Sequence, residues 1–184
     1  MKLPLYLLGL AFSLLLLFLS FRTDAEKPFI QEPSAPRAPS SDPLKSVEAY
    51  VRAAREGNLL QDPSLYTDPS ARMLEARRVT GEQMANAVRS YEACRPYLDT
   101  VRYDNARRLA VIRYRIAART CHPWFLSRGD FSDTWQLDLS EMQRAVRFNH
   151  QSYWHLAAPD TPYRFAFDDW RFDGNGYPVA RRGW

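Results

Sequence analysis

Three polar residues in the C-terminal half of the chain are of types that carry acid–base chemistry. They are Tyr114, His150 and Asp169, the last with Asp168 beside it, and each lies in a stretch of strand-like alternation. An imidazole serves as a general base near neutral pH, and a hydroxyl or carboxylate in an apolar pocket acquires a pKa suited to proton transfer. Brought together in an apolar pocket, these side chains would form a site for proton abstraction.

The same residues also have a purely structural interpretation. A histidine between Phe148 and Ser152 on an apolar strand face is typical of a hydrogen-bonded core residue. Tyr114 is then a core aromatic, and the two aspartates form a bulge with one side in solvent. The sequence favours this interpretation, because His150 has no ordered partner nearby in the chain.

No motif for a nucleotide, metal or nucleophile accompanies these residues. The chain has no Gly-rich phosphate loop, no Gly-x-Ser-x-Gly elbow, no HExxH and no CxxC. Cys121 and His122 are neighbours, so their side chains point apart at a strand end and do not form a catalytic pair. We therefore expect no cofactor and no metal, and a protein that is more plausibly not an enzyme.

Residues 107–119 (RRLAVIRYRIAAR) are the longest strand-like run and predict the inner strand of a curved sheet. Alternate residues of this run are apolar, which predicts a face turned toward the core or toward a pocket. The pocket lining expected from this strand and the later ones comprises Ile112, Ile116, Phe148, Trp154 and Phe165.

The opposite strand faces are cationic and suggest a partner surface. Its expected members are Arg113, Arg115, Arg147 and Tyr153. Outer sheet faces rich in Arg and Tyr suit protein partners or a homodimer. The alternative is a solvated face with cross-strand pairs to Asp138 and Glu141. Nucleic acid is not expected, because the net charge of only +4 comes from arginines interleaved with carboxylates.

Helix signals precede the strands. Residues suited to start helices occur at three places: Asp42 with Pro43, Asp68 with Pro69, and Thr80 with Gln83. Gly57 ends the first helix as a left-handed cap. After Pro96 the apolar period becomes two, which predicts strands over 98–104, 107–119, 134–142, 144–156 and 163–174.

The last predicted strand changes parity at Asp168 and Asp169, which we interpret as a bulge. Helices followed by antiparallel strands are the α+β pattern. We expect three helices packed on one face of a curved antiparallel sheet of about four to six strands, covered on one side only.

Two cysteines suggest a disulfide in an exported domain. Cys94 ends the third helix and Cys121 follows the long strand, and a turn at 104–107 folds these ends together. Two buried free thiols are the alternative.

The N-terminus predicts the location. Residues 3–21 carry no charge, and 19 apolar residues reach about 28 Å as a helix, enough to span a bilayer. Residues 22–43 hold five prolines and predict an extended tether. We expect an uncleaved single-pass anchor in the bacterial inner membrane with the domain in the periplasm; the alternative is a signal peptide and secretion to the periplasm.

Four stretches resemble the nuclear transport factor 2-like superfamily, the cone fold shared with ketosteroid isomerase and SnoaL-like proteins. They are VEAYVRAAREGN, LYTDP, VTGEQMANAVRSY and FAFDDWRFDGNGYP, and the likeness covers about residues 44–177, with 178–184 as a tail. Many members enclose a cavity for a small apolar molecule. Others are membrane-tethered assembly subunits, and the periplasmic domain of the VirB-family type IV secretion subunit is similar in layout.

Two departures from that secretion subunit are visible. The cytoplasmic stub is far shorter, and Asp160-Thr161-Pro162-Tyr163 stands where an Asn-Pro-Leu-Gly segment is typical. The sequence therefore predicts a membrane-tethered extracytoplasmic binding or assembly module without catalysis. The alternative is a small-molecule-binding isomerase-like or dehydratase-like protein using His150, Tyr114 and Asp169.

Overall fold

The computed structural model describes residues 41–129 and 133–180. The predicted anchor at 3–21, nearly all of the predicted tether and the last four residues lie outside the described residues. Within the described ranges, none of the helices is long and apolar enough to cross a membrane.

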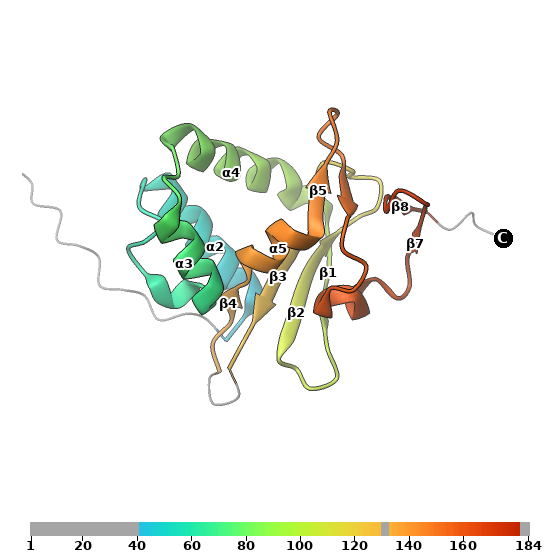
Figure 1. Ribbon diagram of the computed structural model, residues 1–184, viewed down its shortest axis with the longest axis horizontal. Coiled ribbons are helices and arrows are strands. Elements are labelled where there is room, and N and C mark those ends of the chain that lie inside the picture. Colours follow the sequence, from blue (N-terminus) through green and yellow to red (C-terminus); the bar gives the residue numbers. More distant parts are fainter. Residues whose placement is uncertain (1–40, 130–132, 181–184) are drawn as a thin grey trace, which may run out of the picture. The chain divides into compact units, whose positions relative to one another are not determined.

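The first half of the domain is helical, as the sequence predicts (Figure 1). Its elements are α2 (Pro43–Arg55), η1 (Pro63–Leu65), α3 (Asp68–Ala76), α4 (Gly81–Cys94) and η2 (Arg95–Tyr97). Asp42 accepts a hydrogen bond from the Leu44 amide at 3.0 Å, and Gly57 has φ 74° where α2 ends. The capping box of Thr80 and Gln83 is also present. Local capping chemistry therefore fixes these helix ends.

A four-stranded antiparallel sheet follows. Its strands are β1 (Leu98–Tyr103), β2 (Leu109–Tyr114), β3 (Trp124–Ser127) and β4 (Gln136–Leu137), in the order β1-β2-β3-β4. Ile112 pairs with Trp124 and Val111 with Phe125 across β2 and β3. Helices followed by this sheet confirm the α+β class.

The prediction of a strand over residues 107–119 is wrong in its length. β2 ends at Tyr114, and the chain then makes two successive turns, in which the Ala118 amide bonds to the Arg115 carbonyl and the Cys121 amide to the Ala118 carbonyl, each at 2.9 Å. These turns bring Cys121 to Cys94, so alternation beyond Tyr114 does not reflect a strand.

The sheet is covered on both faces, which corrects the prediction of one open face. On one face, Trp124 of β3 packs against Tyr50 of α2, with ring centroids 5.5 Å apart. On the other, Phe125 stacks on Tyr163 at 4.4 Å. Figure 1 shows the short helix containing Tyr163 beside β1 and β2, away from the N-terminal helices.

The second half is built of short elements instead of three long strands. They are α5 (Leu139–Ala145), β5 (Val146–Phe148), β6 (Trp154–Leu156), η3 (Pro162–Phe167), β7 (Arg171–Phe172) and β8 (Pro178–Val179). β5 pairs with β6, and β7 with β8, as separate two-stranded sheets. The predicted strands at 134–142, 144–156 and 163–174 are therefore wrong for most of their length.

Helical spacing and caps explain α5 and η3. Asp138 caps α5 by accepting from the Glu141 amide at 3.2 Å, while Pro162 stands in the first turn of η3. The buried residues of η3 are Tyr163, Ala166 and Phe167, a helical and not an alternating set. The parity change at 168–169 is consequently the end of a helix and not a bulge.

The predicted disulfide between Cys94 and Cys121 is confirmed, with an S–S distance of 2.11 Å. Both cysteines are buried in the core. The bond joins the end of α4 to the loop before β3.

Candidate functional site

The structure does not bring together the three residues predicted for catalysis. Tyr114 is buried beneath the helices, and Asp169 binds Arg113. Arg113 and Tyr114 are neighbours in β2, so their side chains point to opposite faces of the sheet. His150 is exposed in the turn between β5 and β6. Tyr114 and Asp169 are thus separated by the sheet, and His150 lies in solvent.

The environment of Tyr114 is closely packed. Its hydroxyl accepts a hydrogen bond from Trp124 Nε1 at 3.0 Å, and burial raises its pKa to about 12. The hollow that it lines together with Cys94 and His122 has a volume of about 10 Å³. This is about the room of a single water, so Tyr114 is a core residue there and not a pocket wall.

The five residues predicted to line a pocket occupy different environments. Ile112 and Trp154 are buried in the core, whereas Phe148 is 51% exposed. Phe165 is half-buried in η3, and Ile116 is half-buried in the turns after β2. They do not form one wall, because Phe148 faces solvent while Ile112 is fully enclosed.

Arg113 is buried and does not lie on an outer face of the sheet. Its predicted place in the partner surface is therefore wrong. Its Nη1 and Nη2 atoms donate to Asp169 at 2.5 and 3.1 Å, and Nη1 also donates to the Ala166 carbonyl at 2.7 Å. Asp99 accepts from Nη2 at 3.3 Å, and the guanidinium lies 4.8 Å from the centre of the Trp170 ring.

These contacts fasten the C-terminal segment to the sheet. Arg113 is only 3% exposed, so its charge requires the carboxylate partners. Hydrogen bonds from Arg113 hold the pKa of the Asp169 carboxyl below its usual range. Because the Arg113 guanidinium pairs with Asp169 and packs on the Trp170 ring, it holds η3 and the turn after η3 against the sheet.

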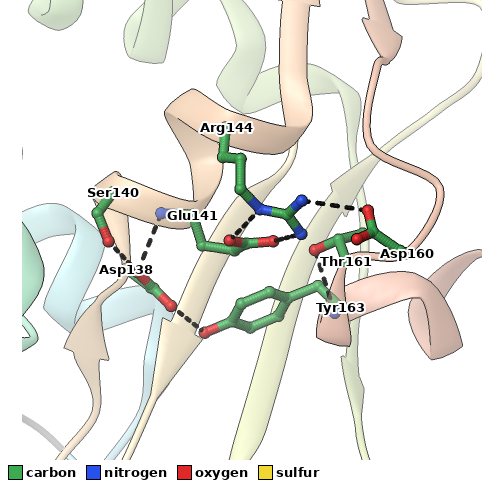
Figure 2. A network of polar contacts seen from close by, with 7 residues as sticks. All are labelled: Asp138, Ser140, Glu141, Arg144, Asp160, Thr161 and Tyr163. Atoms are coloured by element: carbon green, nitrogen blue, oxygen red, sulfur yellow. Dashed lines mark hydrogen bonds and ion pairs between the residues drawn. The ribbon is translucent and has the colours of Figure 1, made fainter.

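A second polar network joins α5 to the start of η3 (Figure 2). The Tyr163 hydroxyl donates to Asp138 Oδ2 at 3.0 Å, and Asp138 Oδ1 accepts from the Ser140 hydroxyl at 3.0 Å and the Glu141 amide at 3.2 Å. Burial, with the negative charge of Asp138, raises the pKa of Tyr163 far above its usual value. The pair therefore holds its proton on tyrosine.

The outer part of this network is an ion-pair chain. Arg144 donates to both oxygens of Glu141, at 2.8 and 2.7 Å, and to Asp160 at 3.1 Å. Burial acts to raise the pKa of Glu141, but hydrogen bonds from Arg144 and Thr161 outweigh it and lower that pKa. Every carboxylate in Figure 2 accepts a hydrogen bond, so the network joins α5 to the start of η3.

The β5–β6 turn presents the exposed residues. Asn149 Oδ1 accepts from the amides of Gln151 at 2.9 Å and Tyr153 at 3.0 Å, which closes the turn that carries His150. In Figure 1 this turn projects beyond the ends of β5 and β6. Phe148 precedes it and makes a T-shaped ring contact with His122, with the ring centroids 5.7 Å apart.

Two arginines lie at the base of this hairpin, and Arg147 points to the face of β5 opposite to Phe148 because the two residues are neighbours in the strand. The Arg119 guanidinium lies 5.6 Å from the Tyr153 ring centre, and its carbonyl accepts from the Trp154 amide, which places the turns after β2 beside β6. Arg119 and Arg147 are exposed and have no ion pair with any described residue. We call this set the hairpin surface: Arg119, Arg147, Phe148, His150 and Tyr153.

Sequence reasoning found part of this surface. It named Arg147 and Tyr153 and placed Arg119 on the cationic face of the predicted strand 107–119, but it placed Phe148 and His150 on an inner face. The sequence did contain a signal for this turn. Residues 149–152 are all polar, a composition typical of turns, and they separate the apolar residues of 146–148 from those of 154–156. Ser152 indeed has φ 60° in the structure.

Comparison with protein families, curated proteins and solved structures found no match for this chain. The described residues define an α+β domain that carries one disulfide and an exposed cationic-aromatic hairpin. Its function is therefore argued from that geometry.

Proposed function

We propose that this chain is a membrane-tethered, extracytoplasmic binding or assembly module without catalysis, and that the hairpin surface binds an acidic protein partner. The observation that carries this proposal is Phe148, which is 51% exposed on a hairpin where Arg147, and Arg119 beside it, have no ion pair with any described residue. Large apolar side chains exposed beside arginines are typical anchors of protein interfaces.

The chemistry of the surface indicates the kind of partner. Arg119 and Arg147 supply donors for carboxylates, and Tyr153 already stacks under Arg119, so its ring is ordered before binding. Covering Phe148 would remove apolar area from water. A partner that combines acidic side chains with an apolar residue complements this surface.

The location rests on two supports. The Cys94–Cys121 disulfide is typical of oxidising compartments. Residues 3–21 have the length and composition of an anchor, followed by a proline-rich tether. We place the domain in the bacterial periplasm, tethered to the inner membrane, with secretion after cleavage as the alternative.

The assignment to the cone-shaped superfamily also stays a proposal. Three helices before an antiparallel sheet support it. The short strands and the replacement of the expected last strand by η3 depart from that pattern. The alternative function, an isomerase-like or dehydratase-like protein, gains no support from the positions of Tyr114, His150 and Asp169.

Site-specific photo-crosslinking tests the proposed surface. A benzophenone amino acid replaces Phe148 in the full chain in membranes, and the matched control replaces Leu60, which is similarly exposed on the helical side. We expect a discrete crosslinked product from position 148 and none from position 60. Two differently tagged copies of the chain distinguish a homodimer from another partner.

A charge variant provides the second readout. Arg147→Glu with Phe148→Ser should abolish the crosslink from a benzophenone at Tyr153, because it reverses the charge and removes the apolar anchor. Only monomer from both positions 148 and 153, or equal products from position 60, would contradict the proposal.

A further inference from the structure

A groove of about 480 Å³ lies between β6 and the β7–β8 turn, and its lining residue His155 pairs across the strands with Arg147 of the hairpin surface. Its lining includes His155, Pro159, Arg164, Phe172, Asp173 and Gly176. This volume falls in the range of small-molecule sites in proteins.

Gly176 holds the groove in shape. It has φ 82°, and a Cβ added there would lie 2.4 Å from the Leu156 carbonyl oxygen. The Gly176 carbonyl accepts from the Leu156 amide at 2.9 Å. Because only glycine permits this approach, the β7–β8 turn is fastened to the backbone of β6 and the groove is formed without a ligand.

Arg164 supplies a charge that the domain does not neutralise. Its guanidinium lies 4.6 Å from the centre of the Phe172 ring, and it has no carboxylate partner among residues 41–129 and 133–180. A cation on an aromatic face keeps its hydrogen-bond donors and its charge while its side chain is held in one orientation.

His155 supplies a second donor. Its ring packs on Tyr177 at 5.0 Å, and its Nδ1 atom is buried with no partner in the described part of the chain. Nε2 is therefore the ring nitrogen left to contact a ligand in the groove, where it donates a hydrogen bond when it carries the ring proton.

Asp173 brings a negative charge to the same lining. Its Oδ1 atom accepts from the amides of Asn175 at 2.9 Å and Tyr177 at 3.0 Å, which directs that oxygen into the β7–β8 turn. Ala157, Pro159 and Phe172 give the rest of the groove apolar walls.

We propose that this groove binds a small organic carboxylate with an apolar body. Arg164 and His155 Nε2–H donate to the carboxylate, and the body lies against Phe172 and Pro159. Ligand binding in the groove does not require a partner on the hairpin surface, although His155 of the groove is paired with Arg147. Inorganic phosphate lacks the apolar part and is expected to bind more weakly.

Hydrogen-exchange mass spectrometry of the full chain in detergent micelles tests this site, with phenylacetate as the probe. We expect saturable slowing of amide exchange in residues 171–179, and none with phenylacetamide, which lacks the charge. Unsaturable or absent slowing, equal slowing by phenylacetamide, or equal slowing by inorganic phosphate would overturn the proposal.

Variants locate the binding. Arg164→Met should weaken phenylacetate binding by roughly tenfold to a hundredfold, since it removes a charge-assisted pair. The matched control, Arg171→Gln, removes an exposed arginine from the adjacent β7 and should leave binding unchanged. Equal affinity in Arg164→Met and the wild type would contradict the assignment.

Two milder variants test phenylacetate binding in the groove if Arg164→Met fails to fold. Arg164→Lys keeps the charge but not the planar fork, and His155→Leu removes the second donor; each should weaken binding roughly tenfold. His155→Gln keeps a side-chain N–H and should bind better than His155→Leu. No difference among these variants and the wild type would also refute the site.

Discussion

Arg113 is predicted from the sequence to be exposed, but it is buried in the structure. Alternation in β2 places it opposite Tyr114, and that parity is correct. The interpretation as an exposed cation fails because η3 and Trp170 cover that face. A buried guanidinium then depends on Asp169 for its charge balance.

Replacing Asp169 by asparagine should lower the free energy of unfolding by about 1–2 kcal/mol at neutral pH. A fully buried pair would give more, but the Asp169 side chain is 48% exposed and water screens the loss. Urea unfolding monitored by tryptophan fluorescence measures the change. Asp168→Asn, at the exposed neighbouring position, is the control and should change little.

The same variant predicts a change in pH dependence. The pKa of Asp169 is lower in the folded protein than its ordinary value of 3.8, because Arg113 favours the ionised form. The stabilisation is complete above pH 3.8 and is lost as pH falls through the lower folded pKa. The wild type should thus lose more stability than Asp169→Asn on acidification below pH 4, and identical slopes would count against the pair.

At the scale of elements, the predicted caps at Asp42 and Thr80 are confirmed, whereas α3 is capped at Thr67 without a side-chain bond and Asp68 lies inside that helix. Thr80 with Gln83, and Gly57, mark helix ends through bonds made within a few residues. Asp138 caps α5 in the structure, but the apolar alternation around it predicted a strand, and from the sequence Asp138 and Glu141 were expected only in cross-strand pairs. Short apolar stretches satisfy both periods, so tertiary packing chose between them.

The disulfide links the end of α4 covalently to the loop before β3. Cys94 and Cys121 close a loop of 27 residues, and reduction should lower the free energy of unfolding by about 3 kcal/mol on the chain-entropy model. Urea unfolding with and without reductant measures this. Cys94→Ala with Cys121→Ala should match the reduced wild type and be insensitive to reductant; an unchanged midpoint on reduction would contradict the prediction.

At the scale of the whole molecule, the anchor and the disulfide make one joint prediction. The full chain should remain in the membrane fraction after alkaline extraction, and a chain lacking residues 3–21 should not. The cysteines of the full chain should resist maleimide labelling until reductant is added. A soluble mature protein that begins after residue 25 would instead support a cleaved signal peptide.

Local composition and spacing were enough to predict the α+β class, the first three helices and the two faces of β2, since capping and parity are local. The structure was needed to choose the Cys94–Cys121 bond over two free thiols and to show which sheet faces are covered. Arg113 meets Asp169 across 56 residues, and Phe125 meets Tyr163 through η3. Burial is set by such distant contacts, and periodicity within one strand carries no information about them.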